Sequence, residues 1–334
     1  MCKLRCKLRC KLRCNLRHAI LAFAMTFPLC VPAFAQEWPT RPISLIVAFA
    51  PGGSTDLIAR MVALKLKGVL GQTVVVENKA GAGGSIGAGL VTKAAPDGYT
   101  LLLATGSLPL NQVLNKNIPF DIRKDLLPVI QIAYQPLVLV VHKDFAVKTL
   151  PQFVTYVRDA RTPLNYASAG SGSTPHLAGA LLNYALGDKM VHVPYQGGGP
   201  AAVAVLSRQV DCVMSAFGEV IPHIKSGDMI ALGVTTNARS PSLPDVPTLK
   251  SAIPDWVEMA TWHGIMVPAN TPAEIVNRLN AAMKTVLKDP EVQTFLGSLG
   301  GTVVAGSPED FRQMIAVDLD NVSRLVKLAG VTAQ

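Results

Sequence analysis

Three segments of the chain join a strand pattern to a helix pattern through a turn rich in glycine and small hydroxyl residues. The first turn covers 51–56 and reads Pro-Gly-Gly-Ser-Thr-Asp, the second covers 81–87, and the third covers 170–174 and reads Gly-Ser-Gly-Ser-Thr. At such a turn the first amides of the helix have no partner within the helix, and the helix dipole is positive. Junctions of this kind bind anions without a charged side chain, so together they predict a cleft for a small anion at the carboxyl ends of the strands.

The candidate ligand-binding residues follow from these junctions. In the first, we favour the amides of Ser54 and Thr55 over the side chain of Asp56, which could instead cap the helix or pair with Arg60. A fourth glycine turn at 195–200 is either another junction, with Tyr195 as a pocket wall, or an ordinary turn. The predicted ligand-binding set is Phe49, Gly53, Ser54, Thr55, Asp56, Gly83, Gly84, Ser85, Thr105, Ser168, Gly170, Ser173, Thr174, His176, Tyr195 and Ser215.

Motifs for metal, nucleotide or nucleophilic chemistry are incomplete in this sequence. The histidines after the leader form neither His-x-x-x-His nor His-Glu-x-x-His. The segment 170–174 resembles a nucleophile elbow, but Gly172 stands where that motif requires serine. The segment 81–87 fails as a dinucleotide fingerprint because Ile86 stands where the last glycine belongs. We therefore predict no catalytic residue, no metal and no cofactor.

The first 35 residues have the order of a secretory signal peptide. They carry seven basic residues and no acidic one, then an apolar stretch of 13 residues from Ala19 to Val31, then Ala33-Phe34-Ala35 as a small-x-small cleavage site. The apolar stretch is shorter than the ~20 residues of a membrane-spanning helix. The Cys-Lys-Leu-Arg repeat at 2–13 is interpreted as a low-complexity extension of the basic region. We predict cleavage after Ala35 and a periplasmic protein.

Removing the leader changes the meaning of the composition. It holds seven of the 31 basic residues and none of the 22 acidic ones, which leaves 24 against 22 and a net charge of +2. This near-neutral balance argues against a nucleic-acid partner. Five of the six cysteines also lie in the leader, so Cys212 cannot form an internal disulfide and is expected to be a buried small apolar residue.

Strand and helix patterns alternate along the rest of the chain, which is typical of an α/β protein with mainly parallel sheets. Helices are expected at 57–70, 272–287 and 308–328, the last two begun by Thr271 and Ser307 as caps. The predicted strands are 43–49, 73–77, 100–104, 137–142, 165–168, 190–193, 210–215, 230–235 and 264–267.

Two apolar segments, 135–142 and 262–268, look like crossings between two lobes. We predict one lobe from 36–137 plus 260–334 and a second lobe from 138–259. A lobe built from both ends of the chain gives a two-strand hinge, which lets a cleft close on a ligand. One cleft and one hinge need no second subunit, so a monomer is expected.

Many blocks of the sequence match one known family in order. They cover 38–43, 49–60, 76–84, 96–101, 176–179, 192–195, 222–227 and 243–248. On these blocks the chain resembles the Bug-type extracytoplasmic solute receptors of the tripartite tricarboxylate transporters. The resemblance implies a two-lobed periplasmic binding protein of type II, with two parallel-type sheets flanked by helices. It also implies that a small carboxylate is held between the lobes and that membrane subunits of a transporter are partners.

Two positions depart from the pattern of that family. Ala48 replaces a common proline, and Ser215 stands where members often carry Asp or Gly. Family members that bind amino acids can use an acid at the second position to meet the ligand ammonium. The resemblance therefore favours a carboxylate without an amino group for this chain.

Two functions follow from the sequence. The first is a periplasmic binding protein that captures a di-, tri- or aromatic carboxylate and delivers it to a tripartite transporter, with no enzymatic activity. The alternative is an exported enzyme on the same bilobal fold that acts on a carboxylate or ester, in which case Ser173 or His176 would be needed for turnover.

Overall fold

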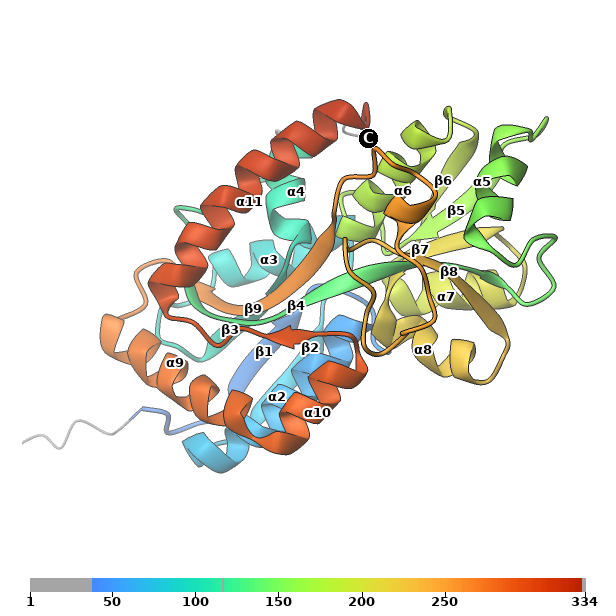
Figure 1. The fold of residues 1–334 in the computed structure, drawn as a ribbon. Helices are drawn as coiled ribbons and strands as arrows, with labels where there is room; N and C mark the ends of the chain where they lie inside the picture. The colour runs from blue at the N-terminus through green and yellow to red at the C-terminus, as the bar shows by residue number, and fades with distance from the viewer. Residues whose placement is uncertain (1–37, 116, 332–334) are drawn as a thin grey trace, which may run out of the picture. The chain divides into compact units, whose positions relative to one another are not determined.

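The structure is a computed structural model that describes residues 38–115 and 117–331 (Figure 1). The predicted signal peptide and its cleavage site lie outside the described residues. The segment Pro39–Gln334 forms one compact unit. The division into lobes at 137 and 260 therefore stays a prediction.

The first sheet has a parallel half and an antiparallel half. The strand order is β2-β1-β3-β9-β4, with β1 parallel to both β2 and β3. Strand β9 runs antiparallel to β3 and to β4, and the short β10 is antiparallel to β4. The strands are β1 (Ile43–Val47), β2 (Val74–Asn78), β3 (Thr100–Thr105), β4 (Leu126–His142), β9 (Ala260–Pro268) and β10 (Thr302–Val303).

The second sheet shares β4 with the first. Residues Leu126–Pro136 of β4 pair with β9, and residues Leu137–His142 pair with β7 and β8. Figure 1 shows this long strand running from one sheet into the other. The remaining strands are β5 (Leu164–Ser168), β6 (Met190–Pro194), β7 (Cys212–Ala216) and β8 (Met229–Val234). Strand β5 runs parallel to both β6 and β7.

The α/β class is confirmed, and the strands fall close to the predicted ranges. The sheets are more mixed than predicted, because β4 and β9 run against the parallel strands. The sequence prediction began this long strand at 137, whereas β4 begins at Leu126. The missed half includes Pro128 and Gln131, which interrupt the apolar pattern that the prediction relied on.

Helices cover both sheets. Those beside the first sheet include α2, α3 and α9, and α7 and α8 pack with strands of the second (Figure 1). Among the described residues, no helix combines the length and apolar character that crossing a membrane requires. The helices are α2 (Ser54–Leu70), α3 (Ser85–Thr92), α4 (Ser107–Leu114), α5 (Leu150–Arg158), α6 (Thr174–Ala185), α7 (Gly198–Leu206), α8 (Phe217–Lys225), α9 (Ala273–Lys288), α10 (Pro290–Ser298) and α11 (Pro308–Leu328).

The two predicted helix caps near the C-terminus had different outcomes. Ser307 caps α11 in a full capping box with Asp310, as predicted. The predicted Thr271 cap is wrong: Pro272 is the N-cap of α9, and the Thr271 hydroxyl donates to the carbonyl of Pro268 instead. A threonine hydroxyl can bond backwards to a nearby carbonyl, and that local bond competes with capping.

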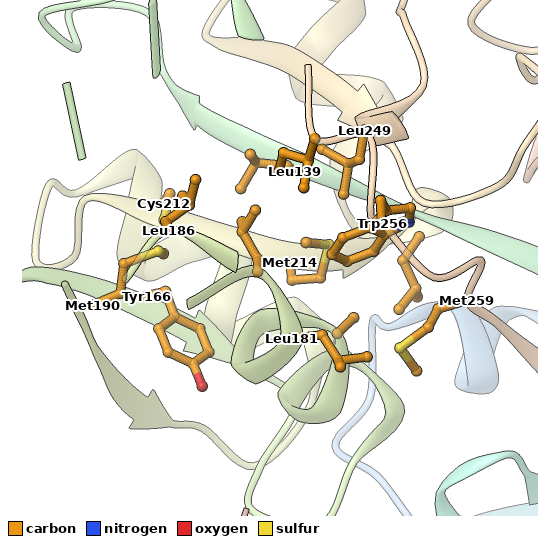
Figure 2. Packing of buried hydrophobic residues seen from close by; sticks show 14 of the residues in the cluster. Leu139, Tyr166, Leu181, Leu186, Met190, Cys212, Met214, Leu249, Trp256 and Met259 are labelled. Atoms are coloured by element: carbon orange, nitrogen blue, oxygen red, sulfur yellow. The ribbon is translucent and has the colours of Figure 1, made fainter. Parts of the chain in front are cut away.

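Helix α11 packs against two separate hydrophobic cores. Its first half places Phe311 and Ile315 in a core with Trp262 and Met266 of β9. Its second half places Val322, Leu325 and Val326 in the core that contains Leu181 and Trp256. Figure 2 shows part of that second core, with Met214 among Leu139, Leu181 and Trp256. A single helix therefore joins the packing of the two sheets.

Cys212 lies in the same second core (Figure 2) and is fully buried, as predicted. Burial raises the pKa of its thiol because the thiolate is disfavoured in apolar surroundings. This side chain is a packing residue, not a reactive thiol.

A glycine in α6 sets the distance between that helix and β5. A Cβ on Gly179 would overlap the ring of buried Tyr166, and its distance to Cδ2 would be 2.6 Å. We expect Gly179→Ala to destabilise the protein by about 1–3 kcal/mol, because the ring must move. Gly68→Ala, in α2 with no atom within 4 Å, should stabilise by about 0.5–1 kcal/mol through helix propensity. Urea unfolding of both variants measures the difference, and equal effects would contradict this account of the packing.

Candidate functional site

A small cavity lies where the strand ends of the two sheets meet. Its volume is about 40 Å³, close to the space that one water molecule takes in the liquid. Five of the predicted ligand-binding residues line it, namely Phe49, Gly53, Ser54, Thr55 and Thr105. The other lining residues are Ser107, Leu137, Ala169, Pro175, Gly198, Ala216, Glu219, Thr261 and His263.

A second cavity, of about 270 Å³, shares Phe49 and Ala169 with the first. Its walls are mostly backbone from two glycine turns. It contains four more predicted residues, Gly83, Gly84, Gly170 and Tyr195. Some predicted residues of all four glycine turns are therefore brought to two adjoining cavities, although they are up to 146 positions apart in the chain, counting from Phe49 to Tyr195.

The N-terminus of α2 already holds an anionic side chain from the other sheet. The amide of Ser54 donates to Oε1 of Glu219 at 2.9 Å, and the Ser54 hydroxyl donates to Oε2 at 3.1 Å. The hydroxyl of Ser215 also donates to Oε2, at 3.2 Å. Burial raises the pKa of the Glu219 carboxyl, and the hydrogen bonds from Ser54 and Ser215 oppose that rise.

The Ser54 amide, predicted as a ligand donor, is bonded to Glu219 in this structure, and its role toward a ligand stays a prediction. The donor is real and lies at the cavity, but its acceptor is a carboxylate 165 residues away in the sequence. A helix N-terminus attracts any nearby anion, including one that the folded chain supplies. Thr55 remains in the first turn of α2, with its hydroxyl oxygen 3.3 Å from Nε2 of His263.

The two sides of the cavities are joined by hydrogen bonds to backbone carbonyls. Asn111 of α4 donates from one amide nitrogen to the carbonyls of Gly83 and Gly172, at 2.9 and 3.0 Å. The amide of Ala50 donates to the carbonyl of Gln196 at 3.0 Å. The Asn111 bonds bring the loop before α3 against the loop before α6, and the Ala50 bond brings the loop before α2 against the loop before α7.

The third junction is held by hydrogen bonds within the protein. Ser173 caps α6 by accepting from the amide of His176 at 3.3 Å. The amide of Thr174 donates to the hydroxyl of Ser107 at 3.2 Å. Nδ1 of His176 accepts from the amide of Gly172 at 3.2 Å. The imidazole of His176 therefore orders the glycine loop and does not contact the hydroxyl of Ser173 as a base would.

A pair of stacked imidazoles lies beneath that loop. The rings of His176 and His192 are 4.0 Å apart at 18°. Nε2 of His192 lies 2.7 Å from the hydroxyl of Ser168. Burial lowers the pKa of His176 to about 4 and that of His192 to about 3, the second also because of its neighbour. Both rings are neutral near pH 7.

Asp56 is bound within its own side of the structure. Its carboxylate accepts from Arg60, from Nδ2 of Asn78 at 2.9 Å and from the amide of Gly52 at 3.0 Å. The pairing with Arg60, one of the roles considered from the sequence, is confirmed. Burial raises the pKa of Asp56, but these hydrogen bonds and the Arg60 charge outweigh it and hold the pKa below its ordinary value.

The remaining predicted residues lie around the cavities without lining either one. Thr174 lines a separate pocket of about 590 Å³ beside α11. The hydroxyl of Ser85 is buried and has no hydrogen-bond partner among the described residues. Asp56, Ser168, Ser173, His176 and Ser215 support the loops and strands that form the walls.

Sequence reasoning missed several residues of the first cavity. Ser107 follows Thr105-Gly106 at the end of β3, a small-residue strand–helix junction like the three that were singled out. Glu219 lies in the first turn of α8, just after an apolar strand and four positions after Ser215. His263 was considered only as a metal ligand. Within residues 38–115 and 117–331, no cluster of His, Cys, Asp or Glu is placed to hold a metal ion.

Comparison with known proteins gives the family of the chain. Residues 58–331 match the model of the tripartite tricarboxylate transporter family receptor, TctC. The chain belongs to this family. The receptor is 35% identical to the protein BugT of Bordetella pertussis over 311 residues. The aligned region covers 92% of this chain and 95% of BugT. Receptors of the family are periplasmic and bind solutes; they are not enzymes.

Three solved structures share the fold of the receptor. The periplasmic binding protein BugD is 34% identical, with a TM-score of 0.86 over 89% of this chain and all of BugD. A protein of R. palustris solved with adipate is 31% identical, with a TM-score of 0.86 over 89% of this chain and all of that chain. MatC of Rhodopseudomonas palustris, solved with malate, is 33% identical, with a TM-score of 0.82 over 86% and 100% of the two chains. The fold is that of a periplasmic binding protein.

The charge on Asp56 should contribute to the stability of the receptor. We expect Asp56→Asn to lower the free energy of unfolding by about 1.5–3 kcal/mol at neutral pH, because it weakens hydrogen bonds to a buried carboxylate. The folded-state pKa is lowered, so this contribution is present above the ordinary Asp value of 3.8 and is lost as the pH falls through the folded-state value. Denaturant unfolding at pH 7 and pH 3 tests this, and a difference that grows at pH 3 would contradict it.

The imidazole pair should give a pH dependence of the same sign, but at higher pH. With its pKa lowered to about 3, His192 stays neutral in the folded state while the unfolded chain gains a proton below the ordinary value of 6.5. Stability is therefore lost as the pH falls from 6.5. We expect His192→Gln to flatten the fall in unfolding free energy between about pH 6 and 4.5 by up to ~1.4 kcal/mol per pH unit. An unchanged slope would mean that His192 is already protonated in the folded protein.

Proposed function

We propose that this receptor captures a small carboxylate in the two adjoining cavities and delivers it to the membrane subunits of a tripartite transporter. The observation that carries the proposal is the chemistry of the cavity walls. They present hydroxyls, backbone amides and glycine turns from both sheets, and neither wall contains Lys or Arg. Neutral donors at helix N-termini suit a small anion that must be released again.

The relatives support the carboxylate part of the proposal. One structure of similar fold holds adipate and another holds malate, both of them dicarboxylates. We infer that the ligand of this receptor belongs to the same class of small carboxylates.

Contacts between the two sides support a cleft that opens and closes. The bonds of Asn111 and Ala50 join loops that approach from different sheets, and each is a single hydrogen bond worth about 1 kcal/mol. Opening would break these bonds together with those that join Ser54 to α8 and Thr174 to Ser107. The membrane subunits would then recognise the closed form, which is the form in which the ligand is covered.

An exported enzyme is the weaker alternative. It would need Ser173 and His176 as nucleophile and base, but the Ser173 hydroxyl caps α6 and Nδ1 of His176 accepts from Gly172. The histidines near the cavities are neutral and held by backbone or by Ser168 and Thr55. Product formation from a carboxylate ester that is lost in Ser173→Ala would favour the enzyme.

A glycine at the contact between the two sides provides the test of closure. A Cβ on Gly83 would overlap the carbonyl oxygen of Ser171 and lie 2.9 Å from the carbonyl carbon of Gly172. We expect Gly83→Ala to weaken binding of malate or adipate at least tenfold, because the sides can no longer meet. Isothermal titration of the protein purified from the periplasm of an expression host measures the change.

Gly52→Ala is the matched control for this substitution. Both glycines have positive φ, +86° at Gly52 and +59° at Gly83, so both substitutions strain the backbone. No atom lies within 4 Å of a Cβ at Gly52. Equal losses of affinity in the two variants would show that strain, not blocked closure, is responsible. No binding of any mono-, di- or tricarboxylate by the wild-type protein would refute the proposed function.

A further inference from the structure

Glu219 brings a negative charge into a site proposed for an anion. It lines the first cavity and is only partly exposed. Its side chain accepts hydrogen bonds from Ser54 and Ser215, and no Lys, Arg or His forms an ion pair with it among the described residues. An ionised Glu219 would therefore repel a carboxylate that enters the same cavity, and weak screening at a buried site makes that repulsion large.

The two oxygens of Glu219 have different surroundings. Oε1 accepts from the backbone amide of Ser54, which can only donate. Oε2 contacts two hydroxyl oxygens, those of Ser54 and Ser215, at 3.1 and 3.2 Å. A hydroxyl can donate to a carboxylate or accept from a carboxylic acid by rotating its hydrogen. The site therefore accommodates both the charged and the neutral form of Glu219, and a proton would lie on Oε2.

We propose that Glu219 takes up one proton from solvent when a carboxylate binds, so that this receptor takes its ligand together with a proton. The inference rests on the proposed function, since it concerns the same cavity. In the bound state the proton lies on Oε2 and is donated to the ligand carboxylate or to the hydroxyl of Ser215. No bond other than that to the proton changes, and the proton returns to solvent when the ligand leaves.

The other titratable groups around the cavity are neutral or paired, so Glu219 is the group expected to take up a proton when a ligand binds. On β9, burial lowers the pKa of His263 to about 4, so its imidazole is neutral near pH 7. On α2, the charge of Asp56 is paired with Arg60. From β7 and α7 the neighbours are Ser215 and Gly198, which carry no charge.

Burial already favours the protonated form of Glu219 in the protein without ligand. It raises the pKa of the Glu219 carboxyl above its ordinary value. A ligand carboxylate nearby raises that pKa further, because two like charges in one site disfavour each other. Linkage then requires that the ligand binds more tightly where Glu219 is protonated, so affinity falls as the pH rises above the pKa of the free protein.

Calorimetric titration with malate and with adipate tests the proposal directly. Between about pH 6.5 and 8.5 both ligands are fully ionised. Titrations at one pH in buffers of different ionisation enthalpy give the number of protons taken up on binding. We expect uptake that approaches one proton per ligand, and a dissociation constant that rises by up to tenfold per pH unit.

Glu219→Gln removes the titrating group and keeps the shape and polarity of the side chain. We expect this variant to bind the same ligands without proton uptake and without the pH dependence, at an affinity no weaker than that of the wild type at pH 8.5. Glu309→Gln, an exposed change at the start of α11, is the control and should behave as the wild type. If Glu219→Gln does not fold, the proton count of the wild type decides alone.

The failures of the two proposals are distinguishable. Binding of malate or adipate with no proton uptake, or uptake that persists in Glu219→Gln, overturns the role of Glu219 and leaves the receptor function intact. A third outcome also overturns the role of Glu219: the wild type prefers a ligand that carries an ammonium group, and Glu219→Gln loses that preference. Glu219 would then act as a permanent anion. Absence of binding for both dicarboxylates refutes the proposed function and this inference with it.

Discussion

The contact between Ser54 and Glu219 is the interaction on which the site depends. It joins the N-terminus of α2, beside the first sheet, to α8 beside the second, and it does so at the wall of the cavity. The amide of Gly218 also donates to the Ser54 hydroxyl at 2.9 Å, so Ser54 is bonded to two consecutive residues of α8. The helix terminus that would attract a ligand anion thus already holds a carboxylate of the protein, and a ligand anion would have to compete with Glu219 for the same donors.

The two sheets are joined both by the chain itself and by helix packing. Strand β4 passes through both sheets, and the return passage near 235–260 is bonded to it, because Thr235 binds both Leu137 and the carbonyl of Met259. Helix α11 adds a third link, since its two halves pack in different cores. Opening of the cleft must therefore bend β4 and the return passage and shift α11 against one of its two cores.

The fold, and the meeting of several glycine turns at two adjoining cavities, could be predicted because local patterns encode them. Apolar runs with glycine turns predicted most of the strands, and the junctions at Gly53 and Gly83 do line the cavities. The roles of individual donors could not be predicted, since the partner of the Ser54 amide is 165 residues away. Pairings of that kind come from packing between sheets, and a helix-start pattern contains no information about them.

The most direct test of this account is a crystal structure of the protein with its tightest-binding carboxylate. The account predicts that the carboxylate oxygens lie between the starts of α2 and α4, within hydrogen-bond distance of Thr55, Ser107 or the glycine turns, and next to Oε2 of Glu219. A ligand in the pocket beside α11, or one held by Lys or Arg, would contradict it.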